Sequence, residues 1–152
     1  MFNIEKIKKQ IDFEYAYGIR EFEITGGEPS EYEKLKEICL YIKKIDIKNK
    51  IAIITNGGLY RCDIWDLIDE VLVSYHTCKD NSLCDKKIFP LGTTYDKVTK
   101  TINIAKHKNK IIRTNTVIAT FNLNTLDLIV DDLISFKPHI INFLPVNLFD
   151  EA

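Results

Sequence analysis

Hydrophobic and polar positions along the chain follow two alternating patterns, one typical of helices and one typical of buried strands. Residues 3–17 place apolar side chains at steps of three and four, which predicts an amphipathic helix that stops at Gly18. Residues 51–54 are a continuous, mostly β-branched apolar run, typical of a strand buried on both faces. The same patterns predict strands at 19–25, 70–76, 110–119 and 139–145, and helices after Ser30 and at 64–68, 94–108 and 124–136.

The predicted elements alternate, helix with strand, from one end of the chain to the other. This order predicts an α/β fold in which about five parallel strands and five helices are joined by right-handed crossovers. Residues 1–152 contain no linker, repeat or low-complexity segment, so we expect a single domain. The pattern is compatible with an open sheet and with part of a barrel.

The strand at 19–25 ends in the most informative stretch of the sequence, Thr25-Gly26-Gly27-Glu28-Pro29. Two glycines allow a tight turn and a close approach of the backbone to a ligand, and the proline restricts the residue before it. Carbonyl groups and a carboxylate at the end of a strand suit a cation such as an α-ammonium group. An ordinary strand-to-helix turn, with Ser30 and Glu33 as a capping box, explains the same residues.

Polar side chains also follow the other predicted strands. They are Thr55 and Asn56 after the second strand, Ser74 and His76 in the third, and Arg113 and Asn115 in the fourth. Taken singly, Asn56 is more simply a turn residue, His76 a structural histidine and Arg113 a partner of a carboxylate. Because the carboxyl ends of parallel strands meet at one rim, we expect these residues to form a common pocket.

Composition excludes several functional classes. A net charge of -1 leaves no electrostatic footprint for nucleic acid or an anionic membrane, and 45% hydrophobic residues indicate a globular domain. No apolar run is long enough to span a membrane and no signal peptide is evident, so we expect a cytoplasmic protein.

The four cysteines show neither a disulfide framework nor a Cys-x-x-Cys motif. Cys39 falls in a helical pattern and is most simply a core residue. Cys78 and Cys84 lie six positions apart in an irregular segment, which is a weak indication of a metal site. We assign no metal ligands from the sequence.

The chain resembles the core of the radical S-adenosylmethionine (SAM) enzymes. Gly-Gly-Glu-Pro stands unaltered at residues 26–29, and Thr-Asn-Gly at residues 55–57 matches the next strand end. Val73-Ser74-Tyr75-His76 matches the strand after that, and more loosely similar stretches occur at 92–95, 113–117 and 142–146.

The resemblance implies a SAM cradle in a partial (βα)6 barrel. Gly26, Gly27 and Glu28 would take the methionyl ammonium group, and Ser74 with His76 would lie near the ribose or carboxylate. Asn115 or Arg113 would reach the carboxylate or a substrate, and Leu144 would flank the adenine. Pro29, Thr55 and Asn56 complete the implied cofactor-binding set.

The sequence departs from the family in one respect. The Cys-x-x-x-Cys-x-x-Cys loop that holds the family's [4Fe–4S] cluster follows a first strand, and neither is found here. We therefore expect the chain alone to be inactive, with SAM as its ligand, a peptide or small molecule as substrate, and a cluster-bearing N-terminal segment or partner. A non-catalytic SAM-binding or regulatory module is a second hypothesis. A third is an unrelated α/β-barrel lyase with Glu28 and His76 as acid and base.

A missing first strand also has a consequence for stability. It would leave the strand at 19–25 as an edge with unpaired backbone groups and exposed apolar surface. We expect this edge to be covered by the N-terminal helix, or the protein to associate.

Overall fold

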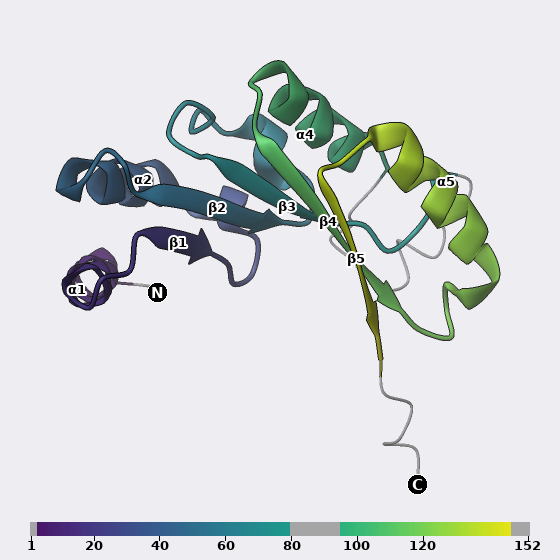
Figure 1. Ribbon diagram of the computed structural model, residues 1–152, viewed down its shortest axis with the longest axis horizontal. Coiled ribbons are helices and arrows are strands. Elements are labelled where there is room, and N and C mark those ends of the chain that lie inside the picture. Colours follow the sequence, from purple (N-terminus) through teal and green to yellow (C-terminus); the bar gives the residue numbers. More distant parts are fainter. Residues whose placement is uncertain (1–2, 80–94, 147–152) are drawn as a thin grey trace, which may run out of the picture.

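The computed structural model describes residues 3–79 and 95–146, which form a parallel sheet with helices packed on one of its faces (Figure 1). The sheet has five strands in the order β1-β2-β3-β4-β5, and every neighbouring pair is parallel. The strands are β1 (Glu21–Ile24), β2 (Lys50–Thr55), β3 (Glu70–Ser74), β4 (Ile111–Ile118) and β5 (Ile140–Pro145). The predicted parallel α/β architecture is confirmed.

Four α-helices and three short 3-10 helices connect the strands in the described part of the chain. The α-helices are α1 (Ile4–Ala16), α2 (Leu35–Ile45), α4 (Tyr95–His107) and α5 (Leu126–Phe136). The 3-10 helices are η1 (Pro29–Glu31), η2 (Gly58–Arg61) and η4 (Leu123–Thr125).

Side chains alternate across the sheet and give it two different faces. In β2 and β4 every second residue is buried, and these residues, such as Ile51, Ile53 and Ile112, face the helices. The opposite, concave face carries a mixture of residues at the positions between them, among them Arg113 and Asn115 in β4 and Ala52 and Ile54 in β2. The prediction that β2 is buried on both faces is therefore wrong, because Ala52 and Ile54 on the concave face are only half-buried.

Two predicted helix features are not present. Residues 65–67 form a turn, and the nearest helix is η2, which precedes them. Ser30 does not cap α2. It lies inside η1, whose N-cap is Glu28, and α2 begins later, at Leu35. A proline at the first position of η1 favours this early short turn, since its fixed φ suits a helical start.

Strands β1 and β5 are the edges of the described sheet. Helix α1 is tied to α2 by Lys8 Nζ, 2.7 Å from Glu37 Oε1, and by the hydroxyl of Tyr41, 2.8 Å from Asp12 Oδ1. The two helices lie on the helix-facing side of β1, and the backbone edge of β1 has no partner strand in the described sheet. No helix in the two described segments is long and apolar enough to cross a membrane.

Candidate functional site

The Gly26-Gly27 turn follows directly from the end of β1. Both glycines have positive φ, 101° and 47°, and a Cβ built on either would meet no atom within 4 Å. Glycine is therefore required by conformation, while the space beside the backbone stays open. No hydrogen bond within the described residues occupies the carbonyl oxygens of this exposed pair, so they are available to a donor such as an ammonium group.

Glu28 joins this turn to the end of β2. Its Oε1 accepts hydrogen bonds from the Thr55 hydroxyl at 2.8 Å and from the Ser30 amide at 3.1 Å. Its Oε2 accepts one from the Asn56 amide at 2.7 Å. A carboxylate offers about four acceptor positions, so one position on Oε2 is left for a ligand.

The turn after β2 is held just as tightly. Gly57 has a φ of 101°, and its amide donates to Thr55 Oγ1 at 3.1 Å. The amide of Gly58 donates to Asn56 Oδ1 at 3.2 Å, and a Cβ at Gly58 would lie 2.4 Å from Ser30 Oγ. The structure thus brings Thr55 and Asn56 to Glu28 as expected. Their side chains accept hydrogen bonds from the backbone amides of the turn.

One row of polar side chains crosses the concave face and consists of Ser74, Asn115 and a third residue, Asn142; we call it the amide row. Ser74 is paired in register with Asn115, and Asn115 with Asn142. Asn142 Nδ2 donates to Asn115 Oδ1 at 2.8 Å, which orients both amides. All three are half-buried; Ser74 is the last residue of β3, while Asn115 and Asn142 lie within β4 and β5.

His76 has a structural task in this fold. Its Nδ1 accepts a hydrogen bond from the Val117 amide at 3.0 Å, and its carbonyl accepts one from Asn122 Nδ2 at 2.9 Å. Burial lowers the pKa of His76 below its ordinary value of 6.5, because the charged imidazolium is poorly solvated there. A neutral ring is what the bond to Val117 requires.

Arg113 lies deeper on the concave face, toward the amino ends of the strands. Its Nη2 is 3.2 Å from Glu23 Oε2, and its Nε forms an ion pair with Glu70. The expected pairing with carboxylates is thus present. Arg113 is two residues before Asn115 on the same face, which puts this ion cluster below the amide row.

Leu144 and Pro29 lie at opposite sides of the rim. Leu144 is in β5, opposite Val117, and its side chain is 48% exposed, so it presents apolar surface for a ligand to cover. Pro29 is buried at the start of η1. The rim therefore collects residues from all five strands.

The cysteines do not form a metal site in the described part of the chain. Cys39 is fully buried in α2, and burial raises the pKa of its thiol to about 12, which confirms its assignment to the core. Cys78 is buried, and Cys84 lies outside the described residues. Among the described residues, no group of three or more His, Cys, Asp and Glu side chains is placed to hold a metal ion.

Sequence analysis missed several residues that shape this region. Asn142 lies in the loosely similar stretch at 142–146, and a single polar residue in a strand pattern does not by itself indicate a site. Asn122 is 1% exposed and bonds the carbonyls of His76 and Val117. The hydroxyl of the buried Tyr75, just after β3, donates to Asp132 in α5 at 2.7 Å, a contact that no local pattern predicts.

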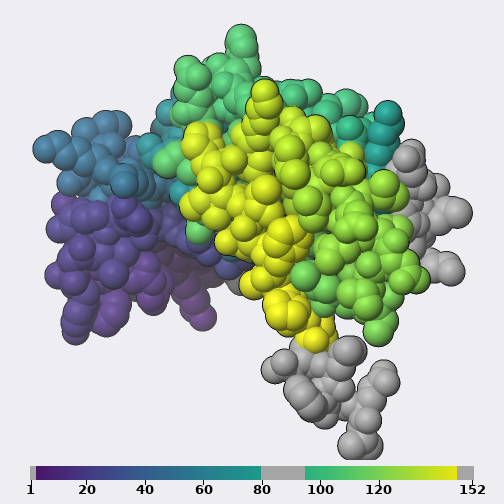
Figure 2. Space-filling model, turned by 45° about the vertical axis from the view of Figure 1, so that its right-hand side comes forward, coloured from purple at the N-terminus to yellow at the C-terminus, as the bar shows by residue number. Residues whose placement is uncertain are grey.

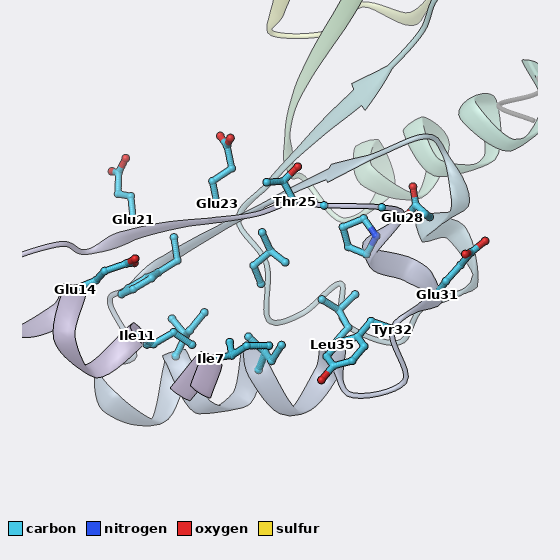
Figure 3. Close-up of a pocket in the computed structure, with 17 residues that line it drawn as sticks. Ile7, Ile11, Glu14, Glu21, Glu23, Thr25, Glu28, Glu31, Tyr32 and Leu35 are labelled. Atoms are coloured by element: carbon cyan, nitrogen blue, oxygen red, sulfur yellow. The ribbon is translucent and has the colours of Figure 1, made fainter. Parts of the chain in front are cut away.

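An apolar groove runs along β1 and reaches the glycine turn, with Gly26, Gly27, Glu28 and Pro29 among its lining residues. It has a volume of about 540 Å³ and lies between α1, β1 and α2, with Ile7, Ile11 and Leu35 in its wall (Figure 3). Glu21 and Glu23 point to the other side of β1, toward the concave face (Figure 3).

The residues present fit part of what a SAM-dependent centre needs. Unoccupied glycine carbonyls, the remaining acceptor position of Glu28 and the amide row are suited to the ammonium, carboxylate and hydroxyl groups of SAM. The described segments contain no group of three thiolates placed together, as a [4Fe–4S] cluster needs.

Comparison with known proteins agrees with this geometry. The family model of the Radical SAM superfamily matches residues 2–133. A probable GTP 3′,8-cyclase of Sulfurisphaera tokodaii is 32% identical over an alignment of 143 residues, which covers 87% of this chain and 44% of that protein. A GTP 3′,8-cyclase of Clostridium perfringens is 32% identical over 107 residues, 68% of this chain and 32% of that protein. The chain thus spans less than half the length of these relatives.

Solved structures support the fold. The radical SAM methyltransferase TsrM from Kitasatospora setae, with cobalamin and a [4Fe–4S] cluster bound, superposes with a TM-score of 0.70 over 94% of this chain and 31% of its own, at 14% identity. TYW1 with a lysine-pyruvate adduct superposes with a TM-score of 0.65 over 93% of this chain and 51% of its own, at 18% identity.

The fold of these neighbours agrees with a partial (βα)6 barrel. The hypothesis of an unrelated lyase is contradicted by the family match. The family works with SAM and a [4Fe–4S] cluster. On the match of its sequence and of its fold, this chain belongs to the radical SAM superfamily.

Proposed function

We propose that this chain is the SAM-binding part of a radical SAM enzyme, with the cluster held by a segment outside the described residues. The observation that supports it most directly is the junction at Glu28, where the carboxylate, two glycine carbonyls and the end of β2 come together. SAM and the cluster, when both are bound, supply radical chemistry that abstracts a substrate hydrogen.

The chain's own residues have three tasks in this proposal. Gly26, Gly27 and Glu28 bind the ammonium group of SAM through carbonyl and carboxylate oxygens. Ser74, Asn115 and Asn142 orient the polar part of the ligand by hydrogen bonds. Exposed Leu144 excludes water from an apolar ring placed against it.

The other assigned residues support these ligand contacts. Thr55 and Asn56 hold the Glu28 carboxylate, and His76 fixes the ends of β3 and β4 through Val117. We propose Arg113 as the residue that faces a substrate, because its ion cluster lies beneath the amide row.

The groove beside β1 is a candidate for the place where the cluster-bearing segment docks. The edge of β1 can pair with an extended segment, and the groove can take that segment's apolar side chains. Glu14 and Glu31 are among the groove's lining residues, and the carboxylates of Glu21 and Glu23 lie on the other side of β1. Lysine or arginine at the alternate positions of the segment, which face that other side, would be complementary.

The names of the curated relatives supply a candidate for the whole enzyme's reaction, cyclisation of GTP. We propose it as the first activity to assay once the cluster segment is restored. A non-catalytic SAM-binding module predicts SAM binding and no turnover in that assay.

SAM binding by the chain as it stands tests the core of the proposal. Titration with SAM, followed by backbone amide NMR, should move the signals of Gly26, Gly27 and Asn56 in the unchanged protein. Glu28→Ala should raise the dissociation constant for SAM about 10- to 100-fold, because it removes a charged acceptor that also holds the turn.

Glu31→Ala is the matched control. Glu31 is an exposed carboxylate in η1, only three residues away, and its loss should leave the dissociation constant within about twofold. Equal losses in both variants, or no binding by the unchanged chain, would contradict the proposed site.

A further inference from the structure

The turn that holds Glu28 is itself held from outside the site, by helix α4. Thr101 is fully buried on α4, and its hydroxyl donates to the carbonyl of Gly57 at 2.6 Å. The same oxygen accepts a hydrogen bond from the amide of Tyr60 at 3.1 Å. A helical threonine commonly bonds a carbonyl one turn earlier in its own helix, and this one bonds a loop from another element instead.

The helix also approaches the turn closely through its backbone. A Cβ built on Gly57 would lie 3.0 Å from the Val98 amide nitrogen and 3.1 Å from Val98 Cγ2. Val98 and Thr101 are three residues apart and share one face of α4. Glycine at position 57 is therefore required twice, by its positive φ and by this contact.

A continuous chain of hydrogen bonds leads from this contact to the proposed ligand site. Thr101 fixes the carbonyl of Gly57, and the amide of Gly57 donates to Thr55 Oγ1. Thr55 Oγ1 in turn donates to Glu28 Oε1, and the next amide along the turn donates to Glu28 Oε2. Losing the Thr101 hydroxyl would leave a buried carbonyl and an amide unsatisfied, which the turn can relieve only by moving.

We infer that Thr101 is a positioning residue for the proposed SAM site, and that it sets the orientation of the Glu28 carboxylate through the turn at residues 55–57. This inference rests on the proposed function, since it assigns a role to a residue that touches no ligand. It makes α4 a part of the binding site's frame, although none of its residues carries a sequence signal for binding.

Isosteric and conservative substitutions test the role. Thr101→Val keeps the volume and removes the hydroxyl, and it should weaken SAM binding about tenfold, the equivalent of one net hydrogen bond. Thr101→Ser keeps the hydroxyl and should restore the dissociation constant to within about threefold of the unchanged chain. Thr101→Ala also removes the hydroxyl, and its side chain is smaller than that of valine. It replaces Thr101→Val in this test if the valine variant does not fold.

A second threonine supplies the matched control. Thr114 in β4 is also fully buried, and its hydroxyl finds no hydrogen-bond partner among the described residues. Thr114→Val should leave SAM binding unchanged. If it weakens binding as much as Thr101→Val does, the effect is a general loss of packing and the inference is overturned.

Hydrogen exchange supplies a readout that needs no ligand. Thr101→Val should accelerate exchange of the Asn56, Gly57 and Ser30 amides, which report the bonds around Glu28, more than it accelerates exchange of core amides in β3. Unchanged exchange at these amides would overturn the inference even if SAM binds. If the unchanged chain binds no SAM and exchange is still faster in Thr101→Val, the turn depends on Thr101. That result would nevertheless overturn both the role of Thr101 in SAM binding and the proposed function.

Discussion

At the scale of residues, Glu28 shows how one side chain can serve two purposes. Three of its acceptor positions organise the junction between β1 and β2, and one remains for a ligand. A carboxylate fixed in this way needs little reordering when a cation arrives, so more of the interaction energy appears as affinity.

His76 is the residue whose protonation should affect the fold. Its pKa is lowered by burial, so the unfolded chain takes up a proton at a higher pH than the folded chain does. Stability is therefore complete above pH 6.5 and falls as the pH drops from there toward the lowered pKa. Thermal unfolding from about pH 7.5 to about pH 5.5 should show stability that falls as the pH is lowered.

Substitution separates His76 from other titrating groups. His76→Gln should be less stable at neutral pH, because the acceptor for the Val117 amide changes, and its unfolding should depend less on pH. His107→Gln, at the exposed end of α4, should keep the full dependence. A pH dependence that survives in His76→Gln would contradict this assignment.

At the scale of elements, β1 is the strand with the most unusual surroundings. It is an edge strand with a half-covered apolar groove on one side and two glutamates on the other (Figure 3). Natural proteins rarely leave such an edge uncovered, since it invites pairing with another chain. Helix α1 lies on the helix-facing side of β1. The backbone edge of β1 is unpaired in the described sheet and can accept another segment.

A synthetic strand can test the groove. A peptide of about six residues that alternates isoleucine with lysine should bind, with isoleucines in the groove and lysines near Glu21 and Glu23. At a hundredfold excess over its dissociation constant it should stabilise the fold by about 2.7 kcal/mol, measured by thermal unfolding. A peptide with glutamate in place of lysine is the control, and equal stabilisation by both would contradict charge complementarity.

At the scale of the whole molecule, the sheet is open at both edges. Strand β5 lies at the surface beside α5 (Figure 2), with Ile140, Ile141, Phe143 and Leu144 exposed. Exposed apolar residues on an edge strand favour association between chains.

Sedimentation over a range of protein concentrations should therefore show association. Phe143→Lys on the helix-facing side of β5 should shift the protein toward monomer, because a charge there opposes burial. Lys137→Gln, an exposed change just after α5, is the control. A monomer at all concentrations would contradict this prediction.

The sequence was sufficient to predict the parallel fold and the rim, because both follow from local patterns. Each strand's apolar run and the glycine turn at residues 26–27 are readable within a few residues. The hydrogen bonds from Thr55 and Asn56 to Glu28, across more than 25 positions, are not local and could not be predicted. The prediction of a helix at 64–68 was wrong, because five residues are too few to distinguish a helical period from a turn.

The position of α1 along the groove has a practical consequence. A strand-forming peptide fused ahead of this helix through a flexible linker would reach the groove within the same molecule, at an effective concentration in the millimolar range. The fused peptide would then stay in the groove when the protein is diluted, whereas a separately added peptide would dissociate. A single fused polypeptide could thus show whether weak recognition is enough to complete the barrel wall.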